Sequence, residues 1–179
     1  MEIEIDMMTD ILTMGKNART ASRSLGKLGT NKKNEVLLAV PKAKRANADY
    51  ILGENHKDVE QGKADGMKSG LLDRLTLTKA RIDGMADGVN QVAGLDDPVG
   101  EVLSMKKRPN GLLIGKKRVP FGVIAVIYES RPNVTLDTFG LCFKTGNAVI
   151  LKGGSDAINS NIAIANVIRE ALKTNGIDE

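Results

Sequence analysis

The stretch that decides the fold reads Val119-Pro-Phe-Gly-Val-Ile-Ala-Val-Ile-Tyr-Glu-Ser-Arg-Pro-Asn133. Within it, Val123 to Tyr128 is a short apolar run that is rich in β-branched residues and lacks clean alternation. Such a run is typical of a strand covered on both faces in a parallel sheet, so we expect a central strand rather than an edge strand. Pro132 ends the strand, because proline biases the preceding Arg131 toward an extended conformation.

A second strand and two helices follow. The spacing predicts a helix over Thr135 to Lys144, with Gly146 as the left-handed residue past its end. It also predicts a buried strand over Ala148 to Leu151 and a longer helix over Asp156 to Thr174. The side chains expected on the inner faces of the two helices are Leu136, Phe139, Leu141, Phe143, Ile162, Ile164, Ala165, Ile168 and Leu172.

These elements make residues 119–179 a β-α-β-α unit of the α/β class. Polar, glycine-rich turns follow both strands, and one of them reads Lys152-Gly-Gly-Ser155. The carboxyl ends of parallel strands are where open α/β sheets bind ligands. With only two strands, the sheet is left open at an edge, so we expect that this chain stops before its fold does or relies on a partner to complete it.

The composition excludes several classes of protein. The 179 residues are 41% hydrophobic and 27% charged, which is typical of a globular protein, and no apolar run reaches transmembrane length. Cys142 is the single cysteine, so an internal disulfide is impossible and a reducing compartment is favoured. We therefore expect a cytoplasmic protein that does not bind a membrane.

Residues 1–98 are expected to form an all-helical arm. Helical stretches are predicted over Ile5–Gly29, Asn31–Gly53, Ala48–Lys63, Leu71–Leu75 and Thr78–Ala93. Pro41 removes a backbone donor from the second stretch and is expected to kink it, the alternative being a split into two helices. Asp96-Asp97-Pro98 ends the arm, and its carboxylates suggest a cap and turn rather than a metal site, because no third ligand is nearby. His56 lies among polar residues and is expected to be a solvated surface residue.

Residues 99–118 are expected to form a β-hairpin between the arm and the α/β unit. Its arms are Val99 to Leu103 and Leu112 to Val119, around a turn at Pro109-Asn-Gly111. Two basic clusters flank the turn, and their residues are Lys106, Lys107, Arg108, Lys116, Lys117 and Arg118. A nucleic-acid interface would need a groove or stacking aromatic residues, and the sequence suggests neither. The favoured interpretation is a solvated hairpin whose charges discourage aggregation, with no nucleic-acid partner.

Two side chains are candidates for chemistry at the strand ends. Asn133 could donate a hydrogen bond from its amide to a carbonyl oxygen or an oxyanion, or it could serve as the N-cap of the following helix. Lys152 could reach a ribose hydroxyl or a phosphate beside Gly153, or it could be an ordinary surface lysine at a turn. The spacing alone leaves both pairs of alternatives open.

Four motifs together identify a family. They read Leu72-Asp-Arg-Leu-Thr-Leu-Thr78, Asp97-Pro-Val-Gly-Glu101, Ile127-Tyr-Glu-Ser-Arg-Pro-Asn-Val-Thr135 and Lys144-Thr-Gly-Asn-Ala-Val-Ile-Leu-Lys-Gly-Gly-Ser155. In this order they resemble the gamma-glutamyl phosphate reductase family of the aldehyde dehydrogenase superfamily, and the resemblance covers essentially the whole chain. It implies NADPH-dependent reduction of L-glutamate 5-phosphate to L-glutamate 5-semialdehyde and phosphate, in proline biosynthesis. It also implies that residues 119–179 are the first half of the dinucleotide-binding domain.

The resemblance assigns roles to the residues that match the family's motifs. Asn133 matches the asparagine whose amide holds the acyl oxygen, and Lys152 matches the lysine that contacts the adenosine ribose, with Gly153 and Ser155 completing that contact. Tyr128 to Pro132 would lie along the cofactor and the substrate approach. Arg131 would bind the phosphate or carboxylate of the substrate, or would brace the turn.

The sequence departs from the family pattern in one respect. The family's nucleophilic cysteine lies downstream of these motifs, and the 179 residues hold only Cys142, within an apolar helix where a thiol is inert. We therefore expect an N-terminal portion of the reductase that is inactive alone and has no metal. The intact enzyme is expected to be a homo-oligomer, and the alternative function is a non-catalytic oligomerisation or interaction module.

Overall fold

A two-stranded parallel sheet lies at the centre of the carboxyl-terminal part of the chain. The structure, a computed structural model, describes residues 2–178, with side chains from residue 10 onward. Strand β3 (Val123–Ile127) pairs in parallel with β4 (Ala148–Lys152), and helix α6 (Asn133–Lys144) connects them. A short 3-10 helix, η1 (Ser155–Ala157), leads into α7 (Ile158–Thr174). The predicted β-α-β-α order and α/β class are confirmed.

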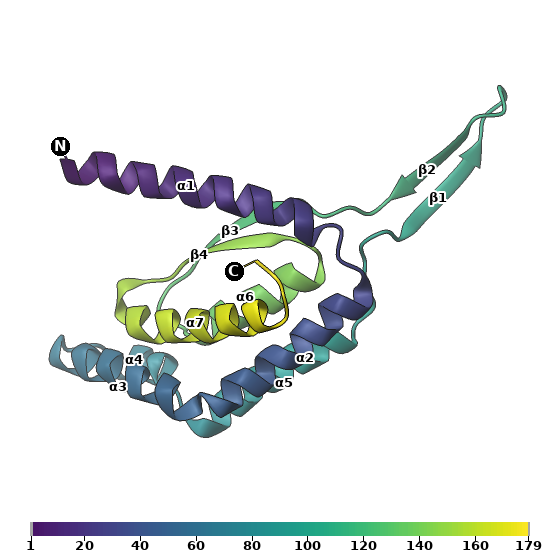
Figure 1. Cartoon of the computed structure of the whole chain (residues 1–179). Helices are drawn as coiled ribbons and strands as arrows, with labels where there is room; N and C mark the ends of the chain where they lie inside the picture. The colour runs from purple at the N-terminus through teal and green to yellow at the C-terminus, as the bar shows by residue number, and fades with distance from the viewer. Residues whose placement is uncertain (1, 179) are drawn as a thin grey trace.

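The expectation that the first strand is central and covered on both faces is wrong for the described residues. Within residues 2–178, β3 pairs with β4 alone, and Ile127 at its carboxyl end is 82% exposed. Helix α1 (Glu2–Leu25) crosses one face of the sheet, and α6 and α7 lie on the other (Figure 1). Although helices lie on both faces of the sheet, they leave part of the apolar surface of β3 exposed to solvent.

Two of the predicted inner-face residues point outward. Leu141 is 54% exposed and Ile162 is 51% exposed, whereas the other predicted residues are buried or partly buried. Each outward residue is two positions away from a buried one, Phe139 or Ile164, and residues two apart do not share a face of an α-helix. Gly146 has φ 73°, which confirms its predicted left-handed conformation at the end of α6.

The helical arm contains four helices besides α1. These are α2 (Thr30–Ala46), α3 (Ala48–Ala64), α4 (Ser69–Leu75) and α5 (Lys79–Gly94). The chain does not change direction at Pro41, where the sequence predicts a kink. Helix α2 continues through Pro41 and ends at Ala46. The corner lies at Asn47, whose side-chain amide donates to the carbonyl of Ala43 at 2.8 Å and so competes with the helical hydrogen bonds.

One hydrophobic core joins the arm to the α/β unit. It contains Leu37 of α2, Val89 of α5, Phe139 of α6 and Ile164 of α7, all of them buried. Helices α2 and α5 run side by side and pack against α6 and α7 (Figure 1). The position of the arm relative to the sheet is therefore set by apolar packing.

The hairpin projects away from the rest of the protein (Figure 1). Strands β1 (Val102–Lys107) and β2 (Leu113–Lys117) are antiparallel, and every residue in them is exposed. Gly111 in the turn has φ 87°. None of the described helices has the length and apolar character needed to cross a bilayer.

Candidate functional site

The ends of β3 and β4 bring the predicted site residues to one edge of the sheet. Ile127 pairs with Lys152 in the parallel register, and the Tyr128 amide donates to the Lys152 carbonyl at 3.0 Å. The loops that follow are also adjacent, since a Cβ added to Gly154 would lie 3.4 Å from the carbonyl carbon of Glu129. Asn133 and Lys152 therefore lie at the same carboxyl-terminal edge, as the parallel topology requires.

Asn133 is the first residue of α6 and does not cap it. The cap position is Pro132, which has no side-chain hydrogen bond to offer, so the N-cap interpretation of Asn133 is wrong. The Asn133 amide Nδ2 instead donates to Oδ2 of Asp137 at 3.0 Å, one turn further along the helix. Asn133 is partly buried and lines a hollow of about 290 Å³ that also reaches Arg131. The amide is thus held in one orientation at the edge of an accessible space.

A buried lysine that the sequence analysis missed lies behind this hollow. Lys44 of α2 is 1% exposed, and its Nζ lies 2.9 Å from the sulfur of Met85, which also lines the hollow. Burial lowers the pKa of Lys44 to about 7, although the nearby charge of Asp137 partly opposes this shift. Lys44 stands four positions after Val40 and seven after Leu37, both buried, so helical periodicity places it on the inner face of α2, whereas Lys42 is exposed.

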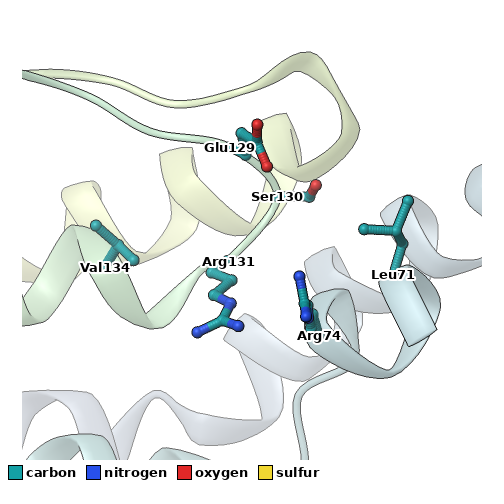
Figure 2. A pocket seen from close by; sticks show the side chains of 6 residues that line it. All are labelled: Leu71, Arg74, Glu129, Ser130, Arg131 and Val134. Atoms are coloured by element: carbon teal, nitrogen blue, oxygen red, sulfur yellow. The ribbon is translucent and has the colours of Figure 1, made fainter.

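Arg131 shares a pocket with an arginine of the helical arm. The pocket has a volume of about 190 Å³ and is lined by Leu71, Arg74, Glu129, Ser130, Arg131 and Val134 (Figure 2). Arg74 comes from α4, and Arg131 comes from the loop between β3 and α6. The sequence analysis did not assign a role to Arg74, although it stands inside the motif at residues 72–78 that helped identify the family.

Tyr128 and Pro132 shape the loop between β3 and α6. The hydroxyl of Tyr128 lies 2.6 Å from Oγ1 of Thr135, which in turn donates to Oδ1 of Asn161 at 2.9 Å. Pro132 is buried. The side chains of Tyr128 and Pro132 are thus engaged within the protein, beside the predicted path of the cofactor.

Gly153 is required by close packing. A Cβ at this position would lie 2.3 Å from Nδ2 of Asn161 and 3.3 Å from the ring of Tyr128, so any larger residue would displace them. Nδ2 of Asn161 is buried and lacks a hydrogen-bond partner among the described residues. The space beside Gly153 is therefore filled by the side chains of Asn161 and Tyr128.

Lys152 and Ser155 present the donors that a nucleotide would need. Both residues are exposed, and Nζ of Lys152 lies 3.2 Å from the Gly153 carbonyl. The hydroxyl of Ser155 lies 3.5 Å from a carboxylate oxygen of Asp156. An exposed ammonium beside a hydroxyl suits ribose hydroxyls or a phosphate, so these residues fit the predicted contact with the cofactor.

The amino end of α7 is already occupied. A carboxylate oxygen of Asp58 accepts from the backbone amide of Ser160 at 2.8 Å, and the other accepts from that of Asn159 at 3.2 Å. Helix amino termini in α/β folds commonly bind cofactor phosphates. Because Asp58 takes this position, the backbone amides of Asn159 and Ser160 are not free to bind a phosphate.

The remaining candidates are structural. Cys142 is buried in α6, and burial raises the pKa of its thiol, so it is a poor nucleophile. Asp97 pairs with Lys33 at 2.5 Å and accepts from the Val99 amide at 3.0 Å, which confirms the predicted turn, whereas the expected cap is wrong because α5 ends at Gly94 with Leu95 in the cap position. His56 is exposed, and the described part of the chain contains no cluster of three potential metal ligands.

Comparison with known proteins decides the family. The chain is 61% identical over 171 residues to a gamma-glutamyl phosphate reductase of Lachnospira eligens, covering 96% of this chain and 41% of the relative. This chain is homologous to part of the gamma-glutamyl phosphate reductases. The resemblance seen in the motifs is thereby confirmed, and the chain spans about two fifths of the length of the reductases it matches. A scan against protein-family models found no match.

Solved structures agree with this assignment. The gamma-glutamyl phosphate reductase of Thermotoga maritima superposes with a TM-score of 0.91 at 45% identity, over 93% of this chain and 40% of that protein. An acetylating aldehyde dehydrogenase from Geobacillus thermoglucosidasius superposes with a TM-score of 0.74 at 15% identity, over 99% of this chain and 36% of that protein. The second likeness shows the fold alone, which these reductases share with aldehyde dehydrogenases.

Proposed function

We propose that this chain is part of an NADPH-dependent reductase that converts L-glutamate 5-phosphate to L-glutamate 5-semialdehyde and phosphate in proline biosynthesis. The observation that carries the proposal is the match to proteins named gamma-glutamyl phosphate reductase across 96% of the chain. The placement of Asn133 and Lys152 at one edge of the sheet supports it. The compartment we propose is the cytoplasm, in keeping with the single cysteine.

The residues of this chain have separate tasks in the proposed reaction. Asn133 donates its amide to the acyl oxygen and stabilises the negative charge that develops there. Arg131 binds an anionic group of the substrate. Lys152, Gly153 and Ser155 hold the ribose of the cofactor, while Tyr128 and Pro132 support the loop beside it. When bound, NADPH supplies the hydride.

The 179-residue chain is proposed to be inactive alone. Its single thiol, Cys142, is buried with a raised pKa, so no group in the chain can act as the cysteine nucleophile of the family. The test is to measure NADP-dependent turnover of the semialdehyde and phosphate by the purified chain and by a complete reductase that contains it. Turnover by the chain that persists in Cys142→Ser would overturn the proposed inactivity. A complete protein that reduces no acyl phosphate would overturn the reductase proposal.

A second candidate function is an interaction module, and the hairpin favours it. Its strands expose apolar side chains to solvent, namely Val102, Leu103, Met105, Leu113 and Ile114. Exposed apolar surface of this kind marks protein interfaces. In the intact enzyme we propose that this hairpin contributes to a homo-oligomer.

The oligomer is tested by sedimentation of the complete protein. The double variant Met105→Lys and Ile114→Lys is expected to lower the oligomeric state, while Tyr50→Lys, at an exposed residue of α3, leaves it unchanged. A hairpin variant that sediments like the wild type would remove the hairpin from the interface.

A further inference from the structure

We propose that Arg74 and Arg131 together form a binding site for the dianionic phosphate group of the substrate. This inference rests on the proposed function and deepens it, since it names a second residue that selects for a phosphorylated acyl group. The two arginines come from different parts of the protein: Arg74 from α4 of the helical arm, and Arg131 from the loop after β3. The site therefore exists only where the arm packs against the α/β unit.

Both guanidinium groups face the same accessible space. Arg74 and Arg131 line the pocket of about 190 Å³ and also the neighbouring hollow of about 290 Å³. Figure 2 shows the Arg74 side chain rising from α4 toward the loop that carries Ser130 and Arg131, and the guanidinium group of Arg131 pointing down from that loop beside it. The inference places the anion in this shared space.

Neither arginine has an ion-pair partner among residues 10–178, whose side chains are described. The ion pairs that arginines make in this range involve Arg45, Arg81 and Arg118 only. Glu129 also lines the pocket, but its carboxylate lies at the top of the view in Figure 2, while the guanidinium of Arg131 points down, away from it. Asp73 lines the neighbouring hollow, but its carboxylate pairs with Arg81 at 2.9 Å. Two cations that face one space and lack an ion-pair partner among the described residues favour a bound anion there.

The backbone that carries Arg74 is rigidly held. The carbonyl of Leu75 accepts from the buried amide of Asn55 at 2.9 Å, and the Leu77 amide donates to the same side chain at 2.7 Å. Arg81 lines the neighbouring hollow, but it is committed to this turn through the Thr76 carbonyl at 2.7 Å and the Asp73 carboxylate at 2.9 Å. Arg74 is thus presented to the pocket by a braced turn, and Arg81 is not available as a third ligand.

A phosphate fits this arrangement better than a carboxylate does. A carboxylate has two oxygens in one plane and is satisfied by a single bidentate guanidinium, whereas the oxygens of a phosphate can accept from donors on two opposite walls. Ser130 lines the same pocket and offers its hydroxyl. Asn133 lines the adjoining hollow, so an acyl oxygen at its amide would belong to the carbon atom that carries the phosphate.

The test is direct anion binding to the 179-residue chain at low ionic strength, where charge interactions are least screened. Inorganic phosphate is titrated into the wild type, Arg74→Gln, Arg131→Gln and the control Arg169→Gln, at an exposed residue of α7, with calorimetry and arginine side-chain NMR as readouts. We expect saturable binding that weakens about tenfold or more in each of the two site variants and is unchanged in the control. L-Glutamate, which offers only carboxylates, is titrated in parallel and is expected to bind far more weakly.

Three results would overturn the inference. The first is that the wild type shows no saturable phosphate binding, and the second is that Arg74→Gln and the wild type bind phosphate equally. The third is that replacing the two arginines weakens the binding of glutamate as much as that of phosphate. The test is independent of the proposed function. If both arginines are needed for phosphate binding but the complete protein reduces no acyl phosphate, the reductase proposal fails and the anion site stands. If the complete protein is active but Arg74→Gln binds phosphate as tightly as the wild type does, only this inference fails.

Discussion

Nδ2 of Asn133 lies 3.0 Å from Oδ2 of Asp137, so a carboxylate one turn along α6 holds the amide that is the candidate oxyanion donor. The same carboxylate is close enough to Lys44 to affect its pKa. Asp137 therefore connects the edge of the site to the buried interior of the helical arm. Its position makes it a positioning residue for Asn133.

Asn133→Ala in the complete reductase should lower kcat by about 10²- to 10³-fold, as expected for loss of one oxyanion donor. The dissociation constant for NADPH should change little, because the role we propose for Asn133 is a contact with the acyl oxygen and not with the cofactor. Asp137→Ala should lower kcat by less, since the amide remains but is no longer oriented. Steady-state kinetics and cofactor titration check both variants. Equal losses in kcat and in NADPH affinity for Asn133→Ala would show that the residue serves the cofactor instead.

Lys152→Ala should weaken NADPH binding in the complete reductase. Loss of a charge-assisted hydrogen bond is worth about 1.5–3 kcal/mol, which corresponds to roughly tenfold or more in the dissociation constant. Fluorescence titration with NADPH measures the change, and Lys173→Ala, an exposed lysine at the end of α7, is the control. Unchanged affinity in Lys152→Ala would remove Lys152 from the site.

Lys44→Met should stabilise the chain near neutral pH, and the gain should shrink as the pH rises. In the folded protein burial lowers the pKa of Lys44 to about 7, against an ordinary value of 10.5. Between these values the unfolded chain binds more protons than the folded one, so wild-type stability gains up to about 1.4 kcal/mol per pH unit from this residue. Below pH 7 the full cost of burying the charge remains.

Urea unfolding at pH 7, 8 and 9 measures this effect. Lys42→Met, on the exposed side of the same helix, should follow the wild-type pH dependence and so serves as the control. If the free energy of unfolding changes with pH in the same way for Lys44→Met and the wild type, the pKa of Lys44 is not lowered in the folded protein.

Asp97→Asn should destabilise the chain by about 3–5 kcal/mol, because it leaves Lys33 buried without its ion pair at 2.5 Å. Burial alone raises the pKa of Asp97, but hydrogen bonds from Lys33, the Val99 amide and Thr30 outweigh it and lower that pKa below 3.8. The stabilisation is therefore present above that value and is lost as the pH falls through the lowered pKa. Denaturant unfolding checks the loss, with the exposed neighbour Asp96→Asn as the control. A similar effect in both variants would argue against the buried pair.

Local sequence patterns were sufficient to predict the strands, helices and turns that surround the site. The apolar run before Pro132, the glycine after α6 and the Lys152-Gly-Gly-Ser155 turn predicted both strands and the edge at which their loops meet. The reason is that strand runs, helical periodicity and left-handed glycines depend on neighbours along the chain. Matching motifs from both halves also identified the family, which the comparisons confirm.

The sequence by itself determined the family, the order of the elements and the loops that carry Asn133 and Lys152. Only the tertiary structure decided that Arg74 of the arm faces Arg131 and that Met85 of α5 covers the ammonium of Lys44. Both depend on how helices that are far apart in the sequence pack together, and no local pattern encodes the distance between such residues. An arginine looks the same in the sequence whether packing pairs it with a carboxylate or directs it into a pocket.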